Sequence, residues 1–483
     1  MMTTAARRIE TDGLCRLIAT LLAASLVAAA IPATGQESGK IDEKYLAQFE
    51  ARENEAFVIG VQAYIYGKPV VEMVKTRFAM ALNPESPEYT PLNHFRHFRR
   101  LIGPDFTAVV TPNNDTLYSI AWLDLTREPV ILHVPDTAGR YYTMQMMDFY
   151  TNNFAYVGKR VTGTAEGDFA IVGPGFRKDL PSGMHKIEAP TPYVWIIGRT
   201  LVNGEKDLPA VHAIQDQYVL TPLSRRGKTG AAARDAFTPK LPRYDDSRPL
   251  AFFRMMNAGI RQNPPPSNEA VWMHLFDRIN VGPSQEFVID QLDLATASGL
   301  RRAITVGQQI VMAKSADLGT KVNGWDMLPP NTGNYGQAYT LRAAIAQKGL
   351  GANSPEEAYY PMANIDGQGR SLDGTNRYVL RFEKGRQPPV DAFWSLTLYR
   401  LPEYSLVANP IDRYSIGDRT KGLQFGRDGS LEIYLQHEAT DKDRQSNWLP
   451  APKGPFYVVL RMYMPKEQVL DGTYKVPPIK RAR

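Results

Sequence analysis

The chain has 483 residues, enough for two or three domains with sizeable cores, and its 56 Lys and Arg exceed its 50 Asp and Glu by six. This basic excess is small and scattered, without a run of five Lys or Arg, so no nucleic-acid partner is expected. The one cysteine, Cys15, excludes a disulfide within the chain.

Residues 1–35 have the pattern of a secretory signal peptide. An apolar run and then small residues follow three arginines, Arg7, Arg8 and Arg16. We expect cleavage after Ala33 or after Gly35, and therefore a periplasmic or secreted protein without a thiol nucleophile or a Cys–metal site. Cys15 lies before the apolar run, which argues against a lipoprotein anchor. No later stretch approaches the roughly 20 apolar residues of a membrane-spanning helix, so no membrane anchor is expected.

The sequence pattern after residue 35 alternates between helix-like and strand-like, in the order α, β, α, β. The pattern predicts a helical lead-in, an N-terminal β domain, a helical and Pro-rich middle section and a C-terminal β domain over 36–105, 106–202, 203–365 and 366–483. Helical spacing is clearest from Ile41 to Leu82, with Gly67-Lys68-Pro69 as the expected break. Helices in the middle section are expected over Leu208 to Tyr218, Asn268 to Ile279, Pro283 to Lys314 and Tyr339 to Lys348.

The two strand-rich stretches share some of their spacing. Two pairs of intervals match: Tyr118 to Pro129 with Tyr378 to Pro389, 11 positions each, and Gly167 to Arg199 with Gly429 to Arg461, 32 positions each. The spacing favours an internal duplication. Two β domains that face each other would form a cleft, which is where ligands bind most often.

Longer motifs resemble those of a bacterial family. They are Thr111 to Ser119, Arg140 to Tyr142 and Gly198 to Thr200 in the first half, and Tyr414 to Thr420 and Asn447 to Pro452 in the second half. Together they resemble the two-domain family catalogued as domain of unknown function 1254 followed by domain of unknown function 1214. The resemblance covers most of the chain after residue 35. It implies two β-sandwich-like units joined by helices in an exported protein, and it implies no settled activity.

The expected fold class is therefore α+β. Two antiparallel β-sandwich-like domains, related by the internal duplication, are joined and flanked by helices.

The segment Thr111 to Tyr118 carries the candidate catalytic residues, Asp115 and Tyr118. Asn and Asp side chains often close turns of this kind, so one interpretation is purely structural. In the other, Asp115 and Tyr118 are acid/base groups in the cleft, with Asn113 and Asn114 beside them as substrate-binding residues.

The stretch 141–148 offers two faces, if it is one strand. Tyr142, Met144, Met146 and Asp148 share one face, and the methionines on it favour core packing. Tyr141 and Gln145 lie on the other face, so they are expected to line the cleft as substrate-binding residues. Asp148 is then expected to be a surface or turn group.

Arg199 and Arg461 end two strongly apolar strands at matched places of the proposed repeat. An arginine at such a place either holds a carboxylate or backbone carbonyls, or anchors a carboxylate or phosphate of a ligand. Two of them suit an acidic ligand. Trp394 completes the expected substrate-binding set as an aromatic contact.

The histidines do not predict a metal site. His94 and His97 have the i, i+3 spacing of one helix face. No acidic residue follows at ligand spacing, and a bound cation would be repelled by the nearby Arg96, Arg99 and Arg100. A basic helix face is the simpler interpretation. His437 follows an expected strand and its role is open.

The chain lacks the motifs of serine esterases, P-loop proteins, dinucleotide-binding proteins and zinc proteases. We therefore expect no cofactor and no metal. The favoured function is a cofactor-independent acid/base enzyme, of hydrolase or lyase type, acting on a small or oligomeric substrate in the cleft between the β domains. The alternative is a periplasmic ligand-binding or assembly protein without catalysis, in which the helical lead-in packs on a partner subunit; a homo-oligomer is expected.

Overall fold

The computed structural model describes residues 43–105, 111–228 and 248–482. The chain divides into two units, Met1–Ala51 and Arg52–Arg483. The expected signal peptide lies outside the described residues. All contacts below belong to the second unit.

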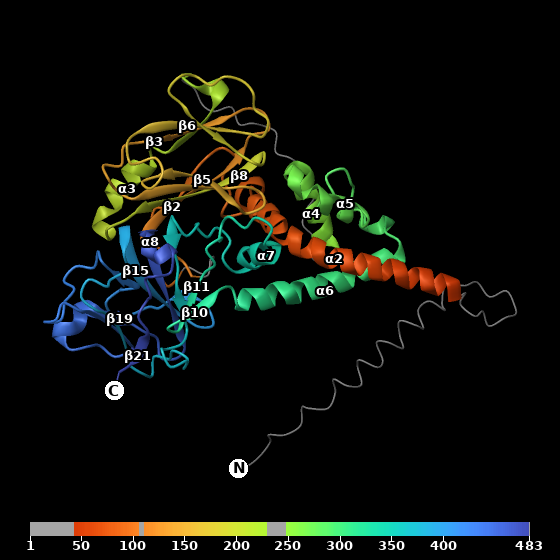
Figure 1. Ribbon diagram of the computed structural model, residues 1–483. Helices are drawn as coiled ribbons and strands as arrows, with labels where there is room; N and C mark the ends of the chain where they lie inside the picture. The colour runs from red at the N-terminus through yellow and green to blue at the C-terminus, as the bar shows by residue number, and fades with distance from the viewer. Residues whose placement is uncertain (1–42, 106–110, 229–247, 483) are drawn as a thin grey trace, which may run out of the picture. The chain divides into compact units, whose positions relative to one another are not determined.

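The described α-helices are α2 (Glu43–Arg77), α3 (Leu208–Gln215), α4 (Ala251–Gln262), α5 (Ala270–Asp277), α6 (Leu294–Ala316), α7 (Tyr339–Lys348) and α8 (Glu467–Leu470) (Figure 1). A π-helical turn, η2 (Phe78–Leu82), directly follows α2. The break expected at Gly67-Lys68-Pro69 is wrong, because α2 continues through Pro69. A proline inside a helix costs about 3 kcal/mol. The residues around it are buried in a core shared with α4 and α6, and this packing outweighs the cost. Helix α4, also buried on one side, was not expected from the sequence.

The N-terminal β region contains two sheets. The first has the order β1 (Arg96–His97), β2 (Thr116–Asp124), β8 (Tyr193–Leu201), β4 (Tyr142–Met147) and β5 (Asn153–Gly158). The second has the order β7 (His185–Glu188), β6 (Gly167–Val172), β3 (Val130–Val134) and β9 (Val219–Pro222). Side chains of both sheets form one hydrophobic core, which holds Met144 and Met146 of β4 with Leu132 of β3 and Ile171 of β6.

The C-terminal β region also contains two sheets. The larger has the order β10 (Thr320–Val322), β11 (Trp325–Met327), β13 (Met362–Ala363), β20 (Phe456–Pro465), β15 (Val390–Arg400) and β16 (Ser405–Leu406), with β12 (Ala358–Tyr359) on β20 and β17 (Ser415–Gly417) on β15. The smaller has the order β19 (Trp448–Pro450), β18 (Leu431–Gln436), β14 (Tyr378–Phe382) and β21 (Ile479–Arg481). These two sheets also share a core. Helices with mainly antiparallel sheets confirm the α+β class.

The strand pairing does not confirm the internal duplication. Tyr118 of β2 lies directly opposite Arg199 of β8. Tyr378 lies in β14 and Arg461 in β20, and these strands belong to different sheets. The residue opposite Arg461 is Ser395 of β15. Equal sequence spacing therefore does not correspond to equal places in the sheets.

The segment of His94 and His97 is not a helix, so that expectation is wrong. Arg96 and His97 form the short edge strand β1, which pairs with Ile120 and Ser119 of β2. The segment is too short and too polar to bury a helical face, whereas β2 supplies free backbone groups for an extended partner.

Helices cover the other face of the first sheet. Trp122, Trp195 and Ile197 point away from the second sheet and pack in one core with residues of α2, α4 and α6. The same face continues through Tyr118 and Arg199, and it is here that the two β regions meet.

Candidate functional site

The face of the first sheet that points away from the second sheet carries four of the expected site residues. Tyr118 lies opposite Arg199, and Arg199 lies opposite Thr143 of β4. Gln145 points to the same side as Thr143 because side chains alternate along a strand, and Tyr141 just before β4 does too. Met144 and Met146 point into the opposite core, as the alternation predicted.

Arg199 is 7 % exposed and is held by neutral acceptors. Its Nη1 donates to Gln145 Oε1 at 2.7 Å and to Asn353 Oδ1 at 3.2 Å. Its Nη2 donates to the carbonyl of Gly351 at 3.0 Å. The guanidinium also lies 5.4 Å from the centre of the Tyr118 ring, a cation–π distance.

Arg461 is 4 % exposed and is also held by neutral acceptors. Its Nη1 donates to Thr397 Oγ1 at 2.8 Å, and its Nη2 donates to the carbonyl of Thr111 at 3.1 Å. The second bond joins the C-terminal sheet to the segment that carries Asp115.

Asp115 is buried and engaged in an ion pair. Arg419 Nη2 donates to its Oδ1 at 2.7 Å, and Ser395 Oγ donates to its Oδ2 at 2.5 Å. Arg419 also donates to the carbonyl of Val202 at 2.9 Å and lies 4.3 Å from the centre of the Phe393 ring. Since both carboxylate oxygens are occupied, Asp115 is better placed to join the two β regions than to accept a proton.

Tyr141 forms a second connection between the two β regions. Its hydroxyl donates to Glu357 Oε1 at 2.7 Å, and Arg160 Nε donates to Glu357 Oε2 at 2.7 Å. Burial, followed by the Glu357 charge, raises the pKa of the Tyr141 hydroxyl well above its usual range. Tyr141 is therefore a neutral hydrogen-bond donor.

Two further tyrosines complete the surroundings of the two arginines. The hydroxyl of Tyr360 accepts from Asn353 Nδ2 at 2.7 Å. The ring of Tyr463 stacks on Phe393 with 4.1 Å between the ring centres. Burial raises the pKa of Tyr360, and the two arginines partly oppose that rise. Burial also raises the pKa of Tyr463.

The arginines remain fully charged in this interior. Burial by itself lowers the pKa of Arg199 and of Arg461, but the surrounding tyrosines outweigh it, and for Arg461 Asp115 contributes as well. The pKa of each guanidinium is consequently raised. No carboxylate of the described chain lies within ion-pair distance of either one.

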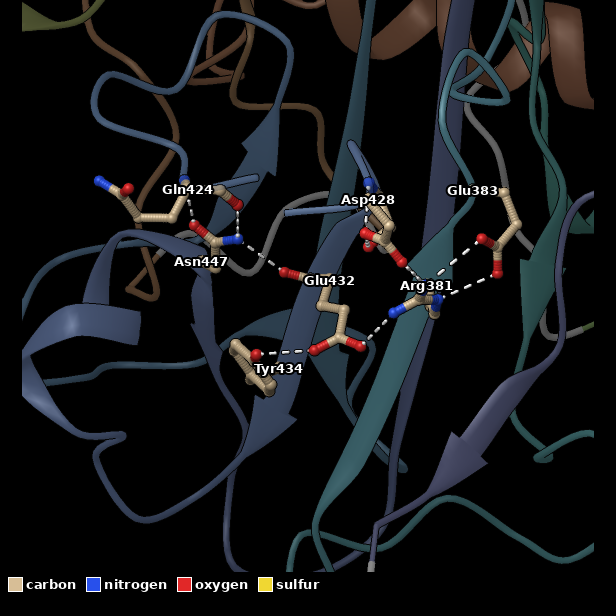
Figure 2. Close-up of polar contacts among 8 residues, drawn as sticks. Arg381, Glu383, Gln424, Asp428, Glu432, Tyr434 and Asn447 are labelled. Carbon is tan, nitrogen blue, oxygen red and sulfur yellow. Dashed lines mark hydrogen bonds and ion pairs between the residues drawn. The ribbon is translucent and has the colours of Figure 1, made fainter. Parts of the chain in front are cut away.

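An arginine of the C-terminal β region shows the opposite arrangement (Figure 2). Arg381 on β14 is partly exposed and pairs with three carboxylates, Glu383 at 3.0 Å, Glu432 at 2.9 Å and Asp428. Its charge is more than balanced, so it needs no further anion.

The remaining residues discussed in the sequence analysis of the site are Asn113, Asn114, Trp394 and Asp148. Asn113 closes a turn, since its Oδ1 accepts from the backbone N–H of Asp115 at 2.6 Å. The Oδ1 of Asn114 is buried and has no hydrogen-bond partner among the described residues. Trp394 belongs to the C-terminal core, on the strand face opposite to its neighbour Ser395, so its expected ligand contact does not fit this placement. Asp148 closes a turn as expected but is buried, not at the surface.

Sequence reasoning missed the partners that come from far along the chain. These are Arg419, Glu357, Asn353, Tyr360 and Tyr463. Arg419 lies within one of the family-like motifs, and that was the one available signal.

Within 43–105, 111–228 and 248–482, no group of three or more His, Cys, Asp or Glu side chains could hold a metal ion. His94 Nδ1 contacts the carbonyl of Leu92 at 2.9 Å, and His437 Nδ1 contacts the carbonyl of Ala451 at 2.9 Å. In the same residues, no helix is both long and apolar enough to cross a membrane.

Comparison with known proteins gives two family matches, both described as "Protein of unknown function": DUF1254 over residues 92–222 and DUF1214 over residues 357–467. Among solved structures, the VPA0106 protein from Vibrio parahaemolyticus is 25 % identical with a TM-score of 0.71, and the match covers 89 % of this chain and 100 % of that one. An uncharacterized protein from Burkholderia cenocepacia is 9 % identical with a TM-score of 0.40, covering 90 % of this chain and 95 % of that one. No curated protein matches the chain.

Proposed function

Because the chain belongs to the two-domain family of DUF1254 followed by DUF1214, whose descriptions give no function, we propose one from its own residues: it binds a small carboxylate- or phosphate-bearing molecule between Arg199 and Arg461. The observation that carries this proposal is uncompensated buried charge. Asp115 pairs with Arg419, and Glu357 pairs with Arg160, which leaves Arg199 and Arg461 without an ion pair among the described residues.

Such an arrangement is costly unless an anion completes it. An ion buried without a partner loses several kcal/mol of solvation, and neutral acceptors recover part of this. A guanidinium has five N–H donors, and three hydrogen bonds are formed by Arg199 and two by Arg461. Donors therefore remain for a bound oxyanion, and Tyr118 and Tyr360 are only partly buried, which leaves them accessible to a ligand.

Calorimetric titration with malonate, succinate, citrate and phosphate tests the proposal. We expect at least one to bind and to raise Tm, and Arg461→Met to weaken it by at least tenfold, the value of one charge-assisted hydrogen bond. Arg381→Met is the matched control, because it removes an arginine whose charge is already balanced. Equal binding to the wild type and to Arg461→Met would contradict the proposal.

The ligand-free stability of Arg461→Met gives an independent check. If Arg461 is present for a ligand, its replacement by an apolar side chain of similar length leaves the unliganded protein about as stable as the wild type, or more stable. A purely structural arginine gives the opposite result, a clear loss of stability without any ligand.

The finer proposal is acid/base catalysis on the bound anion, of hydrolase or lyase type, with Tyr118 as proton donor or acceptor. It is supported by the place of Tyr118 directly opposite Arg199 and by its hydroxyl, which has no hydrogen bond within the described chain. Asp115 then acts by positioning, through Arg419 and Ser395. If an anion that binds is also converted, Tyr118→Phe is expected to keep its affinity and lose turnover, as followed by NMR of the substrate.

We also propose that the protein is exported after removal of residues 1–35 and that it forms a homo-oligomer. The basic and apolar pattern of the N-terminus supports export. The intact mass of the protein from the periplasm or medium tests the cleavage, and light scattering during size-exclusion chromatography tests the oligomer.

A further inference from the structure

A polar pocket lies beside β5, connected to Arg199 through Gln145. It has a volume of about 450 Å³, within the roughly 300–1,000 Å³ of small-molecule sites. Strand β5 provides Asn153 and Tyr156, and the segment 330–356 provides the other lining residues.

One wall of this pocket is fixed by hydrogen bonds. Asn153 Nδ2 donates to the carbonyl of Ala352 at 2.9 Å and to Ser354 Oγ at 3.3 Å. The Tyr156 hydroxyl accepts from the backbone N–H of Ser354 at 2.8 Å and donates to Ser354 Oγ at 3.2 Å. Gln145 Nε2 donates to Asn153 Oδ1 at 2.6 Å and so connects this wall to the sheet behind it. A wall held in this way loses little conformational entropy when a ligand binds.

The other wall offers groups that are free to bind. The side chains of Asn331, Asn334 and Glu356 make no hydrogen bond or ion pair within the described chain, and Asn334 and Glu356 are exposed. A ligand therefore meets an ordered wall on one side and unused donors and acceptors on the other.

The chemistry of the lining selects the ligand. Amides and hydroxyls each donate and accept hydrogen bonds, as sugar hydroxyls do, and a carboxylate accepts from two hydroxyls at once. The described lining contains no Lys or Arg, and Glu356 repels anions. Arg160 lies 5.2 Å from the centre of the Tyr156 ring, but it is paired with Glu357. We propose that this pocket binds a neutral mono- or disaccharide through Asn153, Asn331, Asn334, Ser354 and Glu356. This site differs in charge from the arginine site, and its assignment does not rest on the function proposed above.

The test is saturation-transfer NMR on the intact protein with a panel of neutral sugars: glucose, galactose, mannose, N-acetylglucosamine, maltose, cellobiose and lactose. Calorimetry then measures the affinity of those that bind. We expect at least one to bind, and the double variant Asn331→Ala/Asn334→Ala to weaken it at least tenfold. Asn268→Ala, at an exposed asparagine outside the pocket, is expected to leave the affinity unchanged.

Three results would overturn the proposal. One is that no sugar of the panel binds the wild type. Another is that the double variant binds as tightly as the wild type. The third is that spermidine or malonate displaces the sugar at equal concentration, which would show selection for charge and not for hydroxyl groups. Arg461→Met, which tests the arginine site, is expected to leave sugar binding unchanged, so the two proposals can fail separately.

Discussion

Protonation of His97 is expected to destabilise the fold in mild acid. Its Nδ1 lies 2.9 Å from Ser119 Oγ, and that oxygen accepts from Gln215 Nε2 at 3.2 Å. In the tautomer of His97 that carries its proton on Nε2, the Ser119 hydroxyl donates to Nδ1. Burial, followed by the charge of Arg99, lowers the pKa of His97 from 6.5 to about 4.

The direction of the effect follows from the two pKa values. Between pH 6.5 and about 4 the unfolded chain binds a proton at His97 that the folded chain does not, so stability falls as the pH drops through this window. A shift of this size corresponds to about 3 kcal/mol at 1.36 kcal/mol per unit. Partial exposure of the ring reduces our expectation to about 2 kcal/mol.

Urea unfolding at pH 7 and at pH 4.5 measures this effect. The wild type is expected to lose about 2 kcal/mol more between the two pH values than His97→Gln, which keeps an acceptor for Ser119 but does not titrate. His274→Gln, at an exposed helix position, controls for the loss of an imidazole. An equal loss in the wild type and in His97→Gln would refute the reasoning, because carboxylates alone would then account for the acid sensitivity.

Three other substitutions test the packing and the ion pairs. Asp115→Asn leaves Arg419 without its carboxylate and is expected to cost about 2 kcal/mol in urea unfolding, less than the roughly 3–5 kcal/mol of a fully buried pair because the Arg419 side chain is 26 % exposed. In a double-mutant cycle, additivity with Arg419→Met would contradict the pairing. Gly299→Val is expected to cost about 3 kcal/mol or more, because even a Cβ at this position would lie 2.2 Å from the carbonyl oxygen of Glu53 and push α6 from α2. A variant as stable as the wild type would show that the two helices do not approach this closely. Arg381→Met is expected to leave the urea midpoint unchanged, since exposed ion pairs contribute little; a large drop would mean that surface charge, not burial, governs stability here.

Strand periodicity predicted the faces of the site correctly because it is a local property. Alternation alone put Tyr141 and Gln145 on one side of β4 and Met144 with Met146 on the other, and the structure confirms both. The spacing of His94 and His97 was misleading because three positions are compatible with a helix and do not require one. The segment is extended because it pairs with β2, and the sequence around His94 and His97 carries no information on that pairing.

The partners of the site residues could not be predicted for the same reason. Arg419 reaches Asp115 across 304 positions, and Glu357 reaches Tyr141 across 216. No spacing rule connects residues so distant. Only the packing of the two β regions shows that Asp115 is already paired, which supports a positioning role in our proposal.

The argument for a ligand at Arg199 and Arg461 rests on a comparison with Arg381. Arg381, whose side chain is 37 % exposed, pairs with three carboxylates, although water can also solvate it. Arg199 and Arg461, almost removed from water, are given amides, hydroxyls and carbonyls. If these partners served stability alone, the carboxylates would be expected at the buried arginines and the neutral acceptors at the exposed one, because a counter-ion matters most where solvent is excluded. This contrast supports our proposal that an anion binds between the two buried guanidiniums, and the stability of Arg461→Met without ligand, compared with its affinity for ligand, decides between this explanation and a structural role.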